Sequence, residues 1–168
     1  MATSWPDERS RNGGIDEIPM PGPGRVWLCG KHFIGPDPEQ ALQRTGAAVV
    51  VCLNERTELE DRYPEYVDWL LANASRRAIW FPLPDMHAPP VDAVNPLFEE
   101  LERRLASGDG MVIHCGAGVG RAGTIAAALL VRGGASIDVA LAVVAASRPM
   151  AGPQTDLQMQ FLAVLAKG

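Results

Sequence analysis

The stretch IHCGAGVGRAGT, residues 113–124, is the most informative part of this 168-residue chain. It sets Cys115 and Arg121 at the two ends of the run GAGVG, in which three of five residues are glycine. Glycine permits tight turns and positive φ, so successive backbone N–H groups of such a run can point at one centre and bind an anion. We therefore expect a loop that binds a phosphate-like oxyanion.

The loop lies between two apolar segments that set its chemistry. Residues 111–115, MVIHC, predict a buried strand, and the apolar residues 121–132 predict a helix. The positive end of the helix dipole attracts an anion, and the planar guanidinium of Arg121 can bind two phosphate oxygens at once. The same groups favour the ionised form of Cys115, which we expect beneath the bound phosphorus. Nucleophilic attack through a cysteinyl-phosphate is the chemistry that follows.

The predicted phosphate-binding residues are those of the loop and its arginine. They are Gly116, Ala117, Gly118, Val119, Gly120 and Arg121. His114, one residue before the cysteine, can hydrogen-bond to loop carbonyls and hold the loop in shape. A glycine-rich strand-to-helix turn with a buried cysteine is the alternative interpretation, and the combined spacing of His, Cys, glycines and Arg makes it the weaker one.

Predicted strands and helices alternate along the rest of the chain. The strands cover residues 25–29, 47–53, 78–84 and 111–115, and the helices cover residues 38–45, 63–74, 95–108, 121–132, 136–146 and 154–167. This alternation indicates an α/β fold, a single domain with a mostly parallel central sheet flanked by helices. Ligands of such folds bind beyond the carboxyl ends of the strands, which is where the glycine loop lies.

The N-terminal segment has a different composition. Residues 1–24 contain four prolines and four glycines, and we expect a flexible or irregular arm there. The folded domain is then expected to cover residues 25–168.

The overall composition argues against several classes of function. A net charge of −5 and a pI near 5.2 disfavour nucleic acid as a partner, because nucleic-acid binders usually carry a basic excess. No apolar run approaches the ~18 residues of a membrane helix, so no membrane partner is expected. We see no apolar signal region and no disulfide framework, and we expect a cytoplasmic location. The histidines lack metal-ligand spacing, so neither a metal nor another cofactor is expected.

Phosphate hydrolysis also requires an acid for the departing oxygen. FPLPDMHAPP, residues 81–90, places Asp85 in a proline-bounded loop after a predicted strand. Its carboxyl group can protonate the leaving oxygen and then act as a base for water, although a turn-capping role is the alternative. In QTDLQ, residues 154–158, the side-chain amides of Gln154 and Gln158 can orient that water, or both side chains can simply line the last helix.

Three motifs together resemble the protein tyrosine phosphatase superfamily, in its compact dual-specificity-like branch. H-C-x5-R is present at residues 114–121, the acid-loop motif is similar to LPD at residues 83–85, and Q-T-x-x-Q is present at residues 154–158. The order and spacing of all three match this branch. The resemblance covers residues 25–168 and implies a phosphotyrosine protein phosphatase II-like fold.

The resemblance also implies an activity and roles for the motif residues. The activity is cysteine-dependent hydrolysis of phosphotyrosine monoesters, with phosphoserine and phosphothreonine monoesters as further substrates. The expected partners are phosphorylated proteins or small aryl phosphates. Cys115 is then the nucleophile, Arg121 the phosphate ligand and Asp85 the general acid.

One position departs from the family pattern. The family usually has Ser or Thr directly after the arginine, where this chain has Ala122, and that hydroxyl is thought to stabilise the thiolate when the intermediate breaks down. Its absence leaves open a phosphate-binding or slow-turnover pseudophosphatase. A cysteine enzyme of another kind, such as a sulfurtransferase or an arsenate reductase, is a third hypothesis, although sulfurtransferase loops usually have one residue fewer between Cys and Arg.

Residues in and near the loop bear on substrate and regulation. None of the five residues GAGVG is basic, whereas phosphoinositide-directed relatives often have lysines there, so that substrate class is disfavoured. Arg56 is interpreted as a solvated surface charge or, less simply, as a contact for a second anionic group. Cys29 and Cys52 are expected in the core, with a protective disulfide to Cys115 under oxidation as the alternative.

Overall fold

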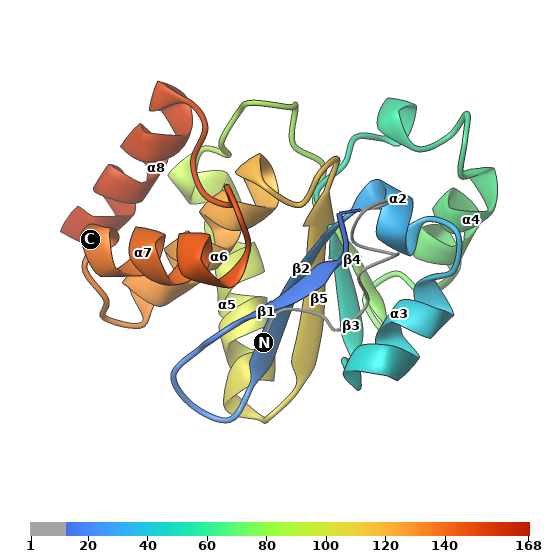
Figure 1. Ribbon diagram of the computed structural model, residues 1–168, viewed down its shortest axis with the longest axis horizontal. Helices are drawn as coiled ribbons and strands as arrows, with labels where there is room; N and C mark the ends of the chain where they lie inside the picture. Colours follow the sequence, from blue (N-terminus) through green and yellow to red (C-terminus); the bar gives the residue numbers. More distant parts are fainter. Residues whose placement is uncertain (1–12) are drawn as a thin grey trace.

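The strand that precedes the glycine loop is the central strand of the sheet (Figure 1). In the computed structural model, which describes residues 13–168, the strands are β1 (Ile15–Ile18), β2 (Arg25–Gly30), β3 (Val49–Cys52), β4 (Ala78–Trp80) and β5 (Gly110–Cys115). The described residues form a five-stranded sheet in the order β1-β2-β5-β3-β4. Four strands run parallel, and β1 is antiparallel to β2 at one edge. This confirms the predicted mostly parallel sheet.

Helices cover both faces of the sheet (Figure 1). One face carries α2 (Lys31–Ile34), α3 (Pro38–Thr45) and α4 (Pro64–Ala72), and the other carries α5 (Val91–Ala106), α6 (Gly120–Arg132), α7 (Ile137–Ser147) and α8 (Asp156–Lys167). A short 3-10 helix, η1 (Arg56–Glu58), follows β3. No helix among residues 13–168 combines the length and apolar character needed to span a bilayer.

The apolar run of β5 explains its central position. All six of its residues are buried, and their side chains alternate between the two layers. Met111 and Ile113 pack into the apolar cluster of the α5–α8 layer, and Val112 packs into the cluster of the α2–α4 layer. A strand covered on both faces reads as a continuous hydrophobic run, which is why the sequence predicted it well.

Local capping signals determine most helix boundaries. α3 begins after Asp37, whose side chain accepts a hydrogen bond from the first turn, and ends at Gly46, which has a φ of 73°. α5 differs from the prediction, because it begins at Val91 rather than at Asn95. Pro96 therefore lies inside the helix and removes one backbone hydrogen bond, which burial of the apolar face of α5 offsets.

The N-terminal segment is more ordered than its composition suggests. Residues 1–12 lie outside the described residues, but Ile15–Ile18 forms β1, so the prediction of an irregular arm over residues 1–24 is wrong for this segment. Three of its four residues are buried. Four residues are too few to show a clear alternation, and the unpaired edge of β2 supplies the backbone hydrogen bonds that make them a strand.

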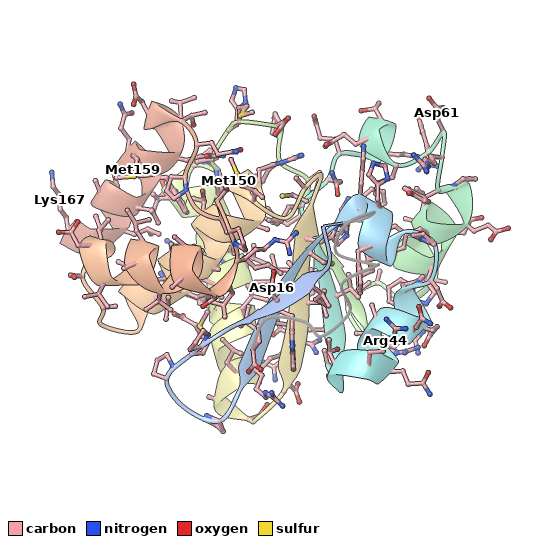
Figure 2. The ribbon with its side chains drawn as sticks, viewed as in Figure 1. Asp16, Arg44, Asp61, Met150, Met159 and Lys167 are labelled. Atoms are coloured by element: carbon pink, nitrogen blue, oxygen red, sulfur yellow. The ribbon has the colours of Figure 1, made fainter. Side chains whose placement is uncertain are left out.

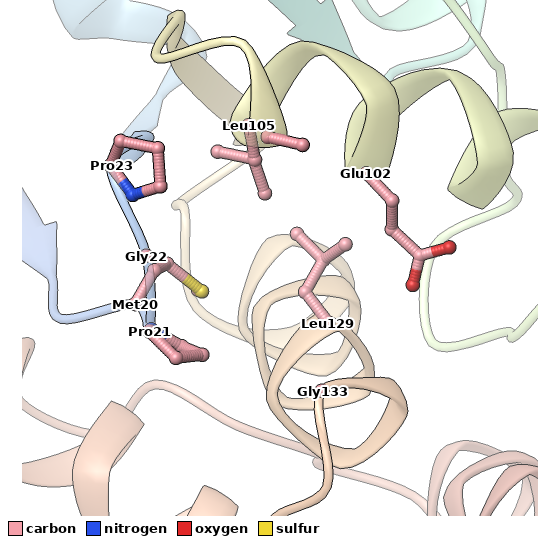
Figure 3. Close-up of a pocket in the computed structure, with 9 residues that line it drawn as sticks. Met20, Pro21, Gly22, Pro23, Glu102, Leu105, Leu129 and Gly133 are labelled. Carbon is pink, nitrogen blue, oxygen red and sulfur yellow. The ribbon is translucent and has the colours of Figure 1, made fainter.

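An apolar pocket lies at the amino-terminal edge of the parallel strands (Figure 3). It has a volume of about 260 Å³ and lies between residues 20–23 and helices α5 and α6, with Leu105 and Leu129 among its walls. Residues 20–23 precede β2, whereas the glycine loop follows β5. The pocket and the loop therefore lie at opposite ends of the parallel strands.

Candidate active site

The glycine loop, residues 116–120, joins the carboxyl end of β5 to the first turn of α6. All five of its carbonyl oxygens accept hydrogen bonds of 2.7 to 3.1 Å from surrounding groups. The donors are the Lys31 N–H to Gly116, the Arg148 guanidinium to Ala117 and Gly118, the Gly123 and Gly152 N–H groups to Val119, and the Thr124 hydroxyl to Gly120. Because a trans peptide holds its N–H opposite its C=O, outward carbonyls turn the amides of the loop toward its centre. This is the arrangement of an anion-binding nest.

Gly118 shows why the loop needs glycine. Its φ is 72°, in the left-handed region, and a side chain there would collide with the backbone carbonyl of Cys29 on β2. Glycine removes both obstacles, so the loop can turn sharply while it lies directly against the neighbouring strand.

The sulfur of Cys115 lies at the floor of the loop. The residue is 3% exposed, and its Sγ accepts a hydrogen bond from the backbone N–H of Ala122 at 3.5 Å. Ala122 has no hydroxyl, and the Thr124 hydroxyl instead donates to the Gly120 carbonyl at 2.7 Å. Within residues 13–168, the sulfur therefore accepts a hydrogen bond from a backbone amide and from no side-chain hydroxyl.

Arg121 is held beside the loop by a carboxylate. Its Nη1 and Nη2 donate to the two carboxylate oxygens of Glu58, each at 2.8 Å, and Nη1 also donates to the carbonyl of Leu83 at 2.8 Å. The guanidinium is almost fully buried, and its Nε has no hydrogen-bond partner among the described residues. A buried donor without a partner is costly, so this Nε is available for an oxygen of a bound anion.

Glu58 is a site residue that the sequence did not predict. Burial raises its pKa, but hydrogen bonds from Arg121 and from the backbone of Glu55 outweigh burial and lower the pKa to about 2. The carboxylate is therefore ionised and neutralises the arginine. A signal was present, because Glu58 closely follows the carboxyl end of a predicted strand and a buried arginine requires a counter-ion.

Asp85 lies over the arginine at the open side of the site. Its Oδ1 is 3.6 Å from Arg121 Nη2 and accepts a hydrogen bond from the Met86 N–H at 2.9 Å. The side chain is 66% exposed, so a substrate and water can both reach it. The structure thus brings Asp85, Arg121 and the loop above Cys115 together.

The loop that carries Asp85 is tied to the N-terminus of α8. The Thr155 hydroxyl donates to the carbonyl of Met86 at 2.9 Å, and Gln158 Nε2 donates to the carbonyl of His87 at 3.3 Å. Gln158 is fully buried, and its Oε1 accepts from the Gln154 N–H at 2.7 Å. Both ends of the Gln158 amide therefore hold loops, and a water-orienting role for this residue stays a prediction.

Gln154, in contrast, reaches the glycine loop. Its side-chain amide lies so close to Gly120 that a Cβ on that glycine would collide with the Gln154 oxygen. Of the two glutamines of Q-T-x-x-Q, Gln154 alone is placed beside the residues that surround the nest.

His114 supports the loop from the opposite face of the sheet. It is fully buried, and burial lowers its pKa to about 4, so the ring is neutral at pH 7. A neutral ring that donates from Nδ1 to the Cys115 carbonyl, at 3.4 Å, accepts at Nε2 from the Tyr66 hydroxyl, at 2.6 Å. Tyr66, on α4, is buried in the apolar cluster and was not identified as a support from the sequence.

The other two cysteines belong to the core. Cys29 and Cys52 are each paired with His114 in the sheet register, so they share its face, whereas Cys115 packs into the opposite cluster. Burial raises the pKa of both thiols, that of Cys52 to about 12. A disulfide to Cys115 requires side chains that point toward one another, so the strands would have to rearrange for either pair to form.

The family comparison agrees with this geometry. Residues 35–162 match the family model described as "PTP-SAK: Swiss Army Knife protein, DSP-PTPase phosphatase domain". The chain belongs to this family. The matched range of the DSP-PTPase domain contains the glycine loop, Asp85 and both glutamines, whereas β1 precedes it. The resemblance to the protein tyrosine phosphatase superfamily, in its dual-specificity-like branch, is confirmed.

Solved phosphatase structures share the fold of this DSP-PTPase domain. Tk-PTP in its active form is 26% identical, with a TM-score of 0.70 over 90% of this chain and 96% of that chain. Kinase associated phosphatase (KAP), with serine replacing its catalytic cysteine, is 22% identical, with a TM-score of 0.76 over 92% and 96%. PTPMT1 in complex with PI(5)P is 18% identical, with a TM-score of 0.66 over 84% and 90%. A comparison with curated proteins found no match.

Proposed function

We propose that this DSP-PTPase domain hydrolyses phosphotyrosine and other aryl phosphate monoesters, with phosphoserine and phosphothreonine as further substrates, through a cysteinyl-phosphate. The observation that carries the proposal is the glycine loop. Its five carbonyls are all held by hydrogen bonds, so its amides turn toward the centre of the loop, and Arg121 adds a buried Nε that has no hydrogen-bond partner within residues 13–168. Such a nest complements a tetrahedral dianion directly over a sulfur nucleophile.

In the first step, the Cys115 thiolate attacks phosphorus, and the bond from phosphorus to the ester oxygen breaks. Asp85 gives its proton to the departing oxygen, so an alcohol or phenol leaves rather than its anion. The loop amides and Arg121 hold the three remaining oxygens, where negative charge concentrates in the transition state. The exposure of Asp85 and its 3.6 Å distance from Arg121 support this assignment.

In the second step, water attacks the cysteinyl-phosphate, and the bond between sulfur and phosphorus breaks. The Asp85 carboxylate takes a proton from that water, so the acid is regenerated as inorganic phosphate forms. Gln154, which lies beside Gly120, is proposed to orient the water. The Cys115 thiolate then leaves with the Ala122 N–H as its hydrogen-bond donor.

The surroundings of the nest favour a substrate with one phosphate. No residue of GAGVG is basic. Among the described residues, Lys31 Nζ donates to the carbonyl of Glu58, and Arg56 pairs with Glu60 on the surface. PTPMT1, a structural neighbour, is described in complex with PI(5)P, but this chain offers no free cation in its loop for further phosphates. We therefore propose phosphorylated proteins and aryl phosphates rather than phosphoinositides.

A second candidate function is a slow or stalled phosphatase, and Ala122 is the observation that favours it. Without a hydroxyl at this position, the leaving thiolate has one donor fewer, so breakdown of the intermediate is slowed. Rapid-mix kinetics with an aryl phosphate distinguish the two functions. Steady turnover supports the enzyme. One burst of product equal to the protein concentration, followed by almost no further product release, supports the stalled form.

The test of the main proposal combines the same assay with Cys115→Ser. This variant is expected to lose turnover but to bind vanadate or tungstate, because the nest is built from backbone. An unchanged rate would exclude Cys115 as the nucleophile, and loss of turnover in Cys29→Ser would show that the assay reports folding rather than chemistry.

A further inference from the structure

Arg148 is a buried arginine that the proposed chemistry does not use. It caps the C-terminus of α7, and it is 3% exposed. Its guanidinium donates from Nε to Gly118 O (2.9 Å), from Nη2 to Ala117 O (2.8 Å), and from Nη1 to Gly13 O (3.1 Å), Gly14 O (3.2 Å) and Asp16 Oδ2 (3.0 Å). One side chain thus joins the back of the glycine loop to the N-terminal segment.

Asp16 is the counter-ion of Arg148. It lies on β1, where Figure 2 labels it, and it is fully buried. A buried ion pair is retained only when good geometry and further hydrogen bonds offset the cost of removing both charges from water. Here the other four hydrogen bonds of the guanidinium go to backbone carbonyls, which help to offset that cost. Asp16 also lies outside residues 35–162, the range that matches the family model.

We propose that Arg148 and Asp16 are positioning residues that keep the glycine loop in its oxyanion-binding shape. Arg148 holds two of the five outward carbonyls, those of Ala117 and Gly118. Without these bonds the two peptide units can rotate, because Gly118 has access to both signs of φ. A rotated peptide turns its carbonyl toward the nest and repels an anion. Asp16 fixes the plane of the guanidinium, so β1 becomes part of the site.

This inference rests on the proposed function, and its test uses two variants and one control. Arg148→Lys keeps the charge but cannot reach both carbonyls and Asp16 at once. Asp16→Asn keeps the size and an acceptor but removes the charge. The control is Arg132→Lys, because Arg132 also pairs with a carboxylate, that of Glu102 between α6 and α5, and makes no hydrogen bond to the loop.

Vanadate inhibition and turnover of an aryl phosphate are measured for each variant, together with its thermal unfolding. Arg148→Lys is expected to weaken vanadate inhibition by about tenfold or more and to lower kcat/KM by a similar factor, as loss of charged hydrogen bonds predicts. Asp16→Asn is expected to weaken both by a smaller factor. Arg132→Lys is expected to leave vanadate inhibition within about twofold of wild type, because it changes stability alone.

Amide signals of the loop provide a readout that does not depend on catalysis. In ¹⁵N NMR spectra without ligand, the Gly118 and Val119 amides of Arg148→Lys should shift or broaden, whereas those of Arg132→Lys should match wild type. If wild type binds no vanadate, the proposed function fails, but these spectra still test the positioning role. The proposal is overturned if Arg148→Lys folds and keeps both wild-type vanadate inhibition and unchanged loop amide signals. If Arg148→Lys does not fold, the same result for a folded Asp16→Asn would overturn it.

Discussion

At the scale of single residues, Ala122 is the position where the site departs from the pattern of its family. The sulfur of Cys115 accepts a hydrogen bond from the Ala122 N–H, and the nearest hydroxyl along the chain, that of Thr124, is bound to Gly120. A thiolate that leaves phosphorus is stabilised by each donor that it keeps. In the proposed mechanism, we therefore expect the missing hydroxyl to slow the second chemical step and to leave phosphate binding intact.

Ala122→Ser should raise steady-state turnover of an aryl phosphate. A new hydroxyl donating to the thiolate contributes about 1.5 to 3 kcal/mol, which corresponds to roughly a ten- to hundredfold faster breakdown of the intermediate. Rapid-quench kinetics should show a burst in wild type that shrinks in the variant. Turnover that stays the same, with the burst unchanged, would mean that breakdown of the intermediate does not limit the rate.

Asp85→Asn should lower kcat by a factor that depends on the leaving group. An amide cannot protonate the departing oxygen, so we expect losses of about 10² to 10⁴ for poorly leaving phenols and much smaller losses for nitrophenols. A series of aryl phosphates measures the slope. Asp92→Asn, on the exposed first turn of α5, is the matched control. An equal loss for every leaving group would contradict the assigned role of Asp85.

At the scale of elements, the N-terminus of α8 is hydrogen-bonded to the loop that carries Asp85. Thr155 caps the helix by accepting from the Gln158 N–H, and the same hydroxyl donates to the Met86 carbonyl in the acid loop. Gln158 adds a second bond to that loop at His87. The position of Asp85 is therefore set in part by Thr155, the N-cap residue of a helix that lies far later in the chain.

Thr155→Val separates the capping role from the acid-loop role. The variant loses a cap worth about 1 kcal/mol and also the bond to Met86, so it should lose stability and show a steeper dependence on the leaving group. Ser136→Ala removes the comparable cap of α7, which accepts from Val139, and should lose stability alone. Thr155→Ser should restore both properties. Identical kinetics in the two capping variants would show that Thr155 does not position the acid.

Elements also show where the sequence predicts well. The buried run of β5 and the caps of α3 are local signals, and both elements were predicted correctly. β1 was missed because its four residues form a strand only through pairing with β2. α2 and η1 were missed for a similar reason, since a single helical turn is stabilised by its tertiary contacts rather than by its own periodicity.

At the scale of the whole molecule, the parallel sheet collects the site from distant segments. The carboxyl ends of β3 and β5 lie side by side, so the segment after β3 brings Glu58 to Arg121, which follows β5. The Glu58–Arg121 pair joins residues that are far apart in the chain, and it links the two layers of helices. Its ionisation therefore affects the stability of the fold as well as the site.

Glu58→Gln should change how stability depends on pH. The folded pKa of Glu58 is about 2, below its ordinary value of 4.5, so its carboxylate stabilises the fold above pH 4.5 and loses this effect as pH falls toward 2. Urea unfolding should show wild type more stable than the variant by about 1 to 3 kcal/mol near pH 6, with the gap closing toward pH 2.

Glu60→Gln is the matched control for this experiment. Glu60 pairs with Arg56 on the surface, and exposed pairs contribute at most about 1 kcal/mol. Its unfolding curve should run close to that of wild type across the pH range. A gap between wild type and Glu58→Gln that does not change with pH would mean that ionisation of Glu58 is not what stabilises the fold.

The sequence by itself indicated the strand, glycine loop and helix that run from Gly110 to Arg132, because a buried apolar run, a cluster of glycines and an apolar helical stretch are patterns visible along the chain. It also predicted Asp85, whose motif is local. Only the tertiary structure decided that Glu58 pairs with Arg121, that Tyr66 supports His114, and that the Gln158 amide bonds to the backbone of Gln154 and His87. It alone brought Arg148 to the back of the loop. These contacts join residues far apart in the chain, and their geometry depends on how sheet and helices pack, which no local pattern of residues records.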